Sequence, residues 1–269
     1  MSPKQRLDLE LLMRGLVPSR QKAQQLIRAG KVRDRAGTVL DKPGTVVSAE
    51  CELRVEHPQR FVSRGGEKLL AGLKAFPINV NGRICLDGGI STGGFTDCLL
   101  QHGAARVYGV DVGYGQTAWS LRTDPRVVLR ERTNLRHLQA DQLFSEGDLR
   151  PSLAVSDVSF ISLRLILPAL RRLLSGPQQE ALVLVKPQFE VGRERVGRGG
   201  VVRDPEAHIQ AIEVVVAAAA SLEWRPQGLV ASPLTGPAGN HEYVLWLAEG
   251  VDGALPDLAE LVSVTLEIN

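Results

Sequence analysis

An aspartate and a lysine each stand directly after an apolar run that is typical of a buried strand. Asp157 ends "LAVSD", and Lys186 ends "ALVLVK", where Pro187 stops the strand. In a parallel sheet, neighbouring strands would bring both side chains over one pocket at the carboxyl edge. An amine in that position gives up its proton more readily beside a second cation, so it could serve as a base. The alternative is a surface salt bridge between two strand ends with no chemical role.

Two further charged residues stand in settings marked by glycine. Lys68 follows the pair Gly65–Gly66 in "SRGGEKL", although a lysine there also suits the solvated start of a helix. Glu242 opens the apolar run "EYVLWLA", which draws its carboxylate toward the core. His208 and His241 lack the spacing of metal ligands, so we predict no metal site.

The stretch "LDGGISTGGFTDCLL" places four glycines where a strand should give way to a helix. Glycine lets the backbone approach a ligand closely, and the following helix offers free N–H groups. Asp111 ends the next strand in "YGVD", where an acid commonly binds a ribose diol. The fingerprints of dinucleotide and P-loop sites are absent, and the Asp87 carboxylate would repel a pyrophosphate. These features favour S-adenosylmethionine, which carries a sulfonium and an ammonium group, over an ordinary glycine turn.

The predicted contacts with this cofactor follow from the same loop and strand ends. The loop would face the methionine end, and Asp111 the ribose. A residue after the third strand is placed to contact the adenine, although it could equally be a plain turn asparagine. The predicted cofactor-binding residues are Asp87, Gly89, Ser91, Gly93, Gly94, Asp111, Asn134 and Asp157.

Apolar runs alternate with longer helical patterns from residue 83 onward. This alternation favours a mostly parallel sheet covered by helices on both faces. Strands are expected at 83–87, 105–111, 126–131, 153–157, 181–186, 228–232 and 242–248, and helices at about 94–101, 116–122, 163–174 and 205–222.

A small basic module precedes this sheet. Helical spacing and Ser19 as an N-cap predict two short helices within residues 4–30, followed by short strands in "KVRD", "TVLD", "TVVS" and "CELRVE". Residues 1–80 hold 15 Lys+Arg and 8 Asp+Glu, a balance of +7, whereas the rest of the chain holds 17 and 22, a balance of −5. This asymmetry indicates a module that faces a polyanion, although a merely solvated charged face would have the same composition.

The overall composition is that of a soluble globular protein, with 43% hydrophobic and 23% charged residues. The chain has no apolar run long enough to span a membrane and no signal-peptide pattern at its start. Cys51, Cys85 and Cys98 lie far apart, as is typical of reduced thiols. We therefore expect a cytoplasmic protein without stable membrane insertion.

Almost the whole chain resembles the TlyA (hemolysin A) family. The stretch "SRQKAQQLIRAGKV" carries the likeness to an S4-like RNA-binding domain. The ordered set Lys68, Asp157, Lys186 and Glu242 matches the K-D-K-E tetrad of FtsJ-like ribose 2′-O-methyltransferases. The supporting motifs, in chain order, are "SRGGEKL", "LDGGISTGGFTDCLL", "YGVDVGYGQ", "DVSFISL", "LVKPQFE" and "GPAGNHEY". One departure, Asp87-Gly-Gly-Ile for Asp-x-Gly-Ala, keeps the acid and the second glycine.

This resemblance implies a Rossmann-like α/β methyltransferase fold, with a mostly parallel seven-stranded sheet and a small N-terminal α+β S4-like domain. The expected domains are residues 1–56 and 68–269, joined by a linker over 57–67. The implied reaction moves a methyl group from S-adenosylmethionine to cytidine 2′-hydroxyls of 16S and/or 23S rRNA, free or in ribosomal subunits. We assign Lys186 as the main base or hydroxyl orienter, with Lys68 and Asp157 tuning it and Glu242 holding the constellation.

Basic residues around the second helix and in a glycine-rich loop are expected to grip RNA phosphates. The loop over residues 191–204 could be a mobile lid that closes on RNA, or a disordered solvated loop. The predicted RNA-binding residues are Arg20, Lys22, Arg28, Lys31, Arg33, Arg64, Arg193, Arg195 and Arg198.

Three other functions compete with methyl transfer. A non-catalytic RNA-binding or ribosome-associated factor would have no need for the tetrad. A hemolysin-like membrane-active protein is disfavoured by the lack of a secretion signal and of a long apolar helix. A pseudouridine synthase also pairs an S4-like module with catalysis, but it needs no methyltransferase-like glycine loop.

Overall fold

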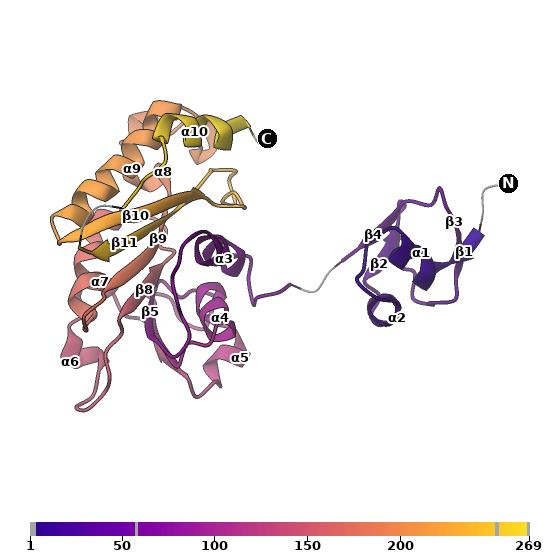
Figure 1. Cartoon of the computed structure of the whole chain (residues 1–269), viewed down its shortest axis with the longest axis horizontal. Coiled ribbons are helices and arrows are strands. Elements are labelled where there is room, and N and C mark those ends of the chain that lie inside the picture. Colours follow the sequence, from indigo (N-terminus) through magenta and orange to yellow (C-terminus); the bar gives the residue numbers. More distant parts are fainter. Residues whose placement is uncertain (1–3, 57–58, 251–252, 268–269) are drawn as a thin grey trace. The chain divides into compact units, whose positions relative to one another are not determined.

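The computed structural model describes residues 4–56, 59–250 and 253–267, and it divides the chain into two compact units, Met1–Gln59 and Arg60–Asn269 (Figure 1). Residues 57 and 58 of the predicted linker lie outside the described residues. Residues 60–67 of that linker belong to the second unit, where Phe61 is buried in a hydrophobic cluster and a helix begins at Gly65.

The first unit is a small α+β fold around one apolar core. Its elements are β1 (Lys4–Arg6), α1 (Leu7–Met13), α2 (Arg20–Arg28), β2 (Val32–Asp34), β3 (Val46–Ser48) and β4 (Leu53–Val55). Strand β1 pairs with β3 and β2 with β4, both antiparallel. The Ser19 side chain accepts the Lys22 N–H at 3.2 Å, which confirms the predicted N-cap. Of the strands predicted here, "TVLD" forms only an isolated bridge between Val39 and Arg33.

The second unit is built on a seven-stranded sheet whose strands confirm all seven predicted positions within a few residues. They are β5 (Ile84–Gly88), β6 (Arg106–Val110), β7 (Val127–Arg130), β8 (Leu153–Ser156), β9 (Glu180–Val185), β10 (Trp224–Ala231) and β11 (Tyr243–Glu249). Their order across the sheet is β10-β11-β9-β8-β5-β6-β7. Only β11 runs antiparallel to its neighbours, so the sheet is mostly parallel, as predicted.

Helices cover both faces of this sheet (Figure 1). One face packs against α3 (Gly65–Ala75), α4 (Gly94–Gln101) and α5 (Trp119–Arg122). The other packs against α6 (Ala140–Leu143), α7 (Leu167–Leu173), α9 (Pro205–Ala220) and α10 (Leu258–Glu267), and the single turn α8 (Pro187–Glu190) packs beside α9. Four short 3₁₀ turns complete the unit, among them η1 (Leu135–His137) and η2 (Leu163–Leu165).

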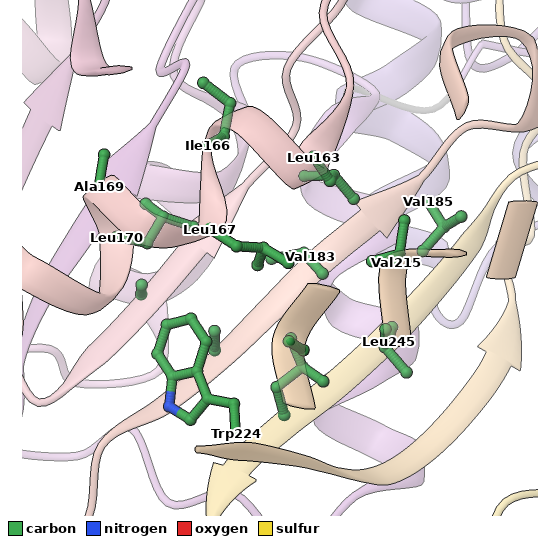
Figure 2. Close-up of a cluster of buried hydrophobic side chains, with 14 of the residues drawn as sticks. Leu163, Ile166, Leu167, Ala169, Leu170, Val183, Val185, Val215, Trp224 and Leu245 are labelled. Atoms are coloured by element: carbon green, nitrogen blue, oxygen red, sulfur yellow. The ribbon is translucent and has the colours of Figure 1, made fainter. Parts of the chain in front are cut away.

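Alternate residues of the central strands enter two separate cores, which is why these strands are apolar throughout. In β9, Val183 and Val185 face the α7 and α9 side, whereas Leu182 and Leu184 face the α3 and α4 side. Figure 2 shows the first of these cores, where Leu167 of α7 points toward Val183 of β9. Trp224 also packs in this core, and its indole N–H donates to the Gln179 carbonyl at 3.1 Å.

The helix predictions were less complete than the strand predictions. Helix α4 has the predicted bounds, and α9 ends two residues early. The predicted helix over 163–174 is divided into η2 and α7, with Pro168 in the first turn of α7. Helices α3 and α10 were not predicted.

The strands β5, β6, β8 and β9 run parallel to one another, so their carboxyl ends lie at the same edge of the sheet. The loops that follow these strands therefore lie close together at that edge.

Candidate active site

A cavity of about 720 Å³ opens at this carboxyl edge. All four predicted catalytic residues line it, together with six of the eight predicted cofactor-binding residues. Asp87 and Gly93 do not reach the cavity wall. Among the predicted RNA-binding residues, Arg64 lines the cavity as well. The lining residues of the first two groups are Lys68, Asp157, Lys186, Glu242, Gly89, Ser91, Gly94, Asp111 and Asn134.

The four predicted catalytic side chains form two ion pairs. The Lys68 ammonium, on α3, lies 2.5 Å from a carboxylate oxygen of Glu242, just before β11. The Lys186 ammonium, after β9, lies 2.6 Å from Asp157, after β8, and donates to the Ser159 hydroxyl at 2.8 Å. Sequence reasoning missed Ser159, although it stands only two residues beyond Asp157. Two amines and two carboxylates therefore meet on one wall with no net charge.

Burial shapes the electrostatics of this wall. Lys68, Lys186 and Glu242 are all less than a tenth exposed. Burial raises the pKa of the Glu242 carboxyl, and the Lys68 charge acts in the opposite direction. A buried ion pair is costly to form but very costly to break, so each member holds the other in a fixed place.

The glycine loop between β5 and α4 is shaped by packing as much as by its cavity side. Gly89 and Gly93 have φ angles of +90° and +98°, which side chains rarely adopt. A Cβ on Gly93 would collide with Leu121, and one on Gly94 with Ser63 and the backbone of Gly66. The loop is therefore pressed between α3 and α5, and its remaining edge forms the cavity wall.

Asp111 fastens this loop at the end of β6. One carboxylate oxygen accepts the Ser91 N–H and the other accepts the Gly113 N–H, both at 2.7 Å. Each oxygen has a second lone pair, so a hydroxyl in the cavity could still bind here. Asn134 caps η1 by accepting the Arg136 N–H at 3.1 Å, so it has the turn role considered above as well as a place on the wall.

Asp87 lies behind the loop and is completely buried. One of its oxygens accepts the Thr96 hydroxyl at 2.7 Å, and the other has no hydrogen-bond partner within the described part of the chain. Burial raises the pKa of Asp87 to about 7, the Thr96 hydrogen bond opposes this, and the nearby Asp157 and Asp111 charges add to it. Sequence reasoning placed this acid on the ligand and missed Thr96.

The basic residues predicted to bind RNA differ in how free their charges are. In the first unit, Arg20 pairs with Asp8 at 2.9 Å, and Lys31 and Arg33 both pair with Glu56. The Lys22 ammonium donates to the neutral Gln25 side chain at 3.1 Å, and Arg28 is exposed. In the second unit, Arg193, Arg195 and Arg198 are exposed, and Arg195 lies 3.9 Å from Asp204.

The loop predicted as a mobile lid is tied to the fold in this structure. The buried Asn240 side chain accepts the Val202 N–H at 2.9 Å and donates to the Gly200 carbonyl at 2.8 Å. His208, also buried, donates to the Val202 carbonyl at 3.0 Å and accepts from the Tyr243 hydroxyl. Two buried side chains thus fix the C-terminal end of the loop.

No group of three or more His, Cys, Asp or Glu within the described ranges is arranged to hold a metal ion. None of the helices in those ranges is both long and apolar enough to cross a bilayer.

Comparisons with known proteins agree with this architecture. The FtsJ-like methyltransferase model matches residues 61–249, and the S4 domain model matches residues 5–50. The 16S/23S rRNA (cytidine-2′-O)-methyltransferase TlyA of Mycobacterium tuberculosis is 51% identical over 256 residues, which cover 95% of this chain and 94% of that protein. YqxC of Bacillus subtilis is 48% identical and covers 99% of this chain and 94% of its own length. A solved structure from Streptococcus thermophilus matches 99% of this chain and 97% of its own, with 41% identity and a TM-score of 0.72.

Proposed function

Because this chain belongs to the TlyA family of FtsJ-like methyltransferases with an S4 domain, we propose that it methylates cytidine 2′-hydroxyls of 16S and/or 23S ribosomal RNA, using S-adenosylmethionine. One observation carries the proposal. Four charged side chains from widely separated parts of the sequence form two ion pairs on the wall of one cavity, beside a glycine loop.

The cavity fits this methyl donor in size and in chemistry. Its volume of about 720 Å³ lies within the usual range for cofactor sites. Asp111 offers lone pairs for a ribose diol, and the Gly89 and Gly94 backbone leaves room for close approach. Burial raises the pKa of the Asp87 carboxyl behind the loop to about 7, so a cationic ligand would favour its ionised form, whereas a pyrophosphate would oppose it. When bound, the donor supplies a methyl group made electrophilic by the positive sulfur.

Lys186 is the residue we expect to act on the ribose hydroxyl. Asp157 and Ser159 hold its ammonium in place, so the amine can orient a hydroxyl that enters the cavity. In its neutral form the amine can accept the proton that the 2′-oxygen loses. Good orientation alone can supply up to about 7–11 kcal/mol of the barrier reduction. Lys68 and Glu242 form the second ion pair. The Lys68 ammonium is a second cation on the cavity wall, and the Glu242 carboxylate balances its charge.

The S4 unit and the exposed arginines of the second unit are expected to hold the RNA. Phosphate contacts of this kind position a substrate without reading much sequence. The partner would be ribosomal RNA or a ribosomal subunit, which places the work of the protein in the cytoplasm.

The experiment is transfer of tritiated methyl groups from S-adenosylmethionine to ribosomal subunits purified from cells that lack this gene. We expect incorporation into rRNA, resistance of the labelled position to alkaline cleavage, and a cytidine at that position. A chain that binds the subunits but transfers no label would be a non-catalytic factor, and the proposal would fail. Leakage of dye from liposomes treated with the pure protein would instead support the membrane-active alternative.

A further inference from the structure

The segment over residues 157–163 links β8 to η2 and carries Asp157, the partner of Lys186. It is held at two places by the chain that follows β9. At its start, Lys186 contacts Asp157 and Ser159. At its end, a second charged side chain, that of Glu190, makes contact. The mechanism above uses the first contact and leaves the second without a role.

The Glu190 carboxylate accepts two hydrogen bonds from this segment. One oxygen accepts the Leu163 N–H at 2.8 Å, and the other accepts the Ser162 hydroxyl at 2.6 Å. Glu190 is only 6% exposed, and within the described residues no Lys, Arg or His lies within 4.0 Å of its carboxylate. Burying a carboxylate without a cation costs several kcal/mol. We therefore expect the Glu190 carboxylate to have a role that offsets its desolvation cost.

The spacing of Lys186 and Glu190 matches their common target. They stand four residues apart, at the N-cap and the last residue of the single turn α8. Residues four apart share one face of a helix, so a single turn presents both side chains to the same segment. The apolar side chain of Leu163 is also anchored in the core (Figure 2), so the end of the segment is fixed by its backbone and by its side chain.

Between the two contacts, the segment contains a strained residue. Phe160 has a φ angle of +66°, in the left-handed region that a bulky side chain rarely adopts. Phe160 is 92% exposed and its ring centroid lies 5.4 Å from that of Phe189, so burial contributes little to holding the residue. Strain of this kind costs about 1–3 kcal/mol and persists only where the surroundings enforce it. The contacts of Lys186 and Glu190 on either side are the enforcing interactions.

We propose that Glu190 is a positioning residue for methyl transfer: its two hydrogen bonds to Ser162 and Leu163 fix the 157–163 segment so that Asp157 and Ser159 hold the Lys186 amine in its productive place. The proposal rests on the proposed function. Glu190 does not line the cavity, so it acts through Lys186 and contacts neither substrate nor donor.

The test compares Glu190→Gln with Glu180→Gln in the full chain. Glu180 is a matched control, because it opens β9 at the opposite end from Lys186, and its carboxylate also braces neighbours, accepting from Trp246 at 3.1 Å and pairing with Arg83. We expect Glu190→Gln to lower kcat by about tenfold or more, since a displacement of 1 Å at the reacting groups can cost about 100-fold. Donor Kd and the KM for ribosomal subunits should stay within about twofold of wild type. Glu180→Gln should keep kcat within about twofold at a similar loss of Tm.

Ser162→Ala keeps the test decisive if Glu190→Gln folds poorly. It removes one of the two hydrogen bonds and should lower kcat about threefold at unchanged donor Kd. In a double-mutant cycle its effect should be smaller in the presence of Glu190→Gln than alone, because both changes remove the hydrogen bond that the Ser162 hydroxyl donates to the Glu190 carboxylate. A wild-type kcat in either variant, or an equal loss of kcat in Glu180→Gln, would overturn the positioning role. Absence of methyl transfer by the wild-type chain would instead contradict the proposed function.

Discussion

Asp8 in the first unit and Asp87 in the second are both completely buried, yet their surroundings are chemically opposite. The Asp8 carboxylate accepts hydrogen bonds from Arg6, Arg20 and Gln24, at 2.9 to 3.1 Å. The Arg6 guanidinium is the main reason that the pKa of Asp8 lies well below its usual range. All three partners lie within 16 residues of Asp8 in the sequence. The first unit therefore satisfies its buried charge by itself.

Asp87 has no such set of partners. It accepts one hydrogen bond from Thr96, and its nearest charged neighbours include two further acids, Asp111 and Asp157. Burial raises the pKa of Asp87 to about 7. A buried carboxylate that its own chain leaves short of donors is costly, and a cationic ligand nearby would reduce that cost. Asp8 with its complete set of partners is therefore a structural charge, and we expect the incompletely paired Asp87 to respond to a ligand in the cavity through its charge and not through direct contact.

The largest expected effect distinguishes two ion pairs that look alike. Lys186 lies 2.6 Å from Asp157, much as Arg20 lies 2.9 Å from Asp8. We expect Lys186→Ala to lower kcat about 1,000-fold, because it removes the base, while donor Kd stays within about twofold. The stability cost should be about 1 kcal/mol or less, because the Asp157 side chain is 22% exposed and can be hydrated. Tritiated methyl transfer, calorimetric titration of the donor and thermal unfolding measure the three quantities. Normal turnover would reject the assignment of Lys186.

The second prediction concerns the first unit, where removing an acid should lower stability and leave donor binding unchanged. Asp8→Ala removes an acceptor shared by Arg6 and Arg20, which are about half exposed and can return to water. We therefore expect a loss of about 2 kcal/mol in the local stability of this unit, less than for a fully enclosed pair. Amide hydrogen exchange of α1 and α2 in the full chain should accelerate about 30-fold. Exchange in α4 and donor Kd should not change, and a parallel loss in α4 would contradict the view of Asp8 as a charge internal to its unit.

The sequence predicts those parts of the fold that local patterns control. The central strands could be found because burial on both faces makes them nearly continuous apolar runs, whereas the partly exposed edge strands β7 and β10 were found from shorter apolar stretches. Helix α3 was missed because Gly65 and Gly66 suggest a linker, whereas in the structure a Cβ on Gly66 would collide with Phe61. Helix α10 was missed since Val262, Val264 and Thr265 favour strands by propensity, and its packing outweighs that preference.

In the candidate site as well, local sequence patterns were predictable and contacts between distant residues were not. The glycine loop is a local strand–loop–helix pattern, so its general place was predictable from the residues alone. Lys68 and Glu242 are 174 positions apart, and no local signal indicates that they meet, so only the family resemblance pointed to the pair. A sequence also does not show which way an acid faces. For that reason only the structure shows that Asp87 is buried behind its loop and that Glu190 contacts residues 162 and 163.

The third prediction tests the unsatisfied carboxylate through pH. The folded state keeps a proton on Asp87 up to about pH 7, whereas the unfolded chain releases it near pH 4. Folded protein therefore binds more protons in between, and the contribution of Asp87 to stability is lost as the pH rises from 4 to 7. Asp87→Asn removes this dependence, so the variant should gain about 4 kcal/mol over wild type at pH 8 and about 1 kcal/mol or less at pH 4.5.

The same variant should bind the donor about tenfold more weakly at pH 8, where the Asp87 carboxyl is ionised and the amide that replaces it carries no charge. Chemical unfolding at the two pH values and donor titration make both measurements. Thr96→Ser, which retains the hydroxyl, serves as the control and should leave both quantities close to wild type. Equal stability profiles for wild type and Asp87→Asn would show that Asp87 keeps its ordinary pKa in the folded protein, as a paired carboxylate would, and the contrast with Asp8 would disappear.

The smallest effect concerns which basic residues of the first unit face RNA. Lys31 and Arg33 share Glu56, so an acid accompanies them, whereas Lys22 and Arg28 line a groove of about 560 Å³ along α2 together with neutral polar side chains. If charge must be unpaired to bind phosphate, the double variant Lys22→Ala/Arg28→Ala should weaken subunit binding several-fold. The slope of log Kd against log salt should then fall by about 1.4–1.8, as expected for two lost phosphate contacts. Arg33→Ala is the matched control, and its slope should change by about 0.5 or less because Lys31 and Glu56 remain paired. If the slope changed more for Arg33→Ala than for the double variant, an ion pair within the unit would not prevent a basic side chain from binding RNA phosphate. The ion pairs of the first unit would then not predict which of its residues bind RNA.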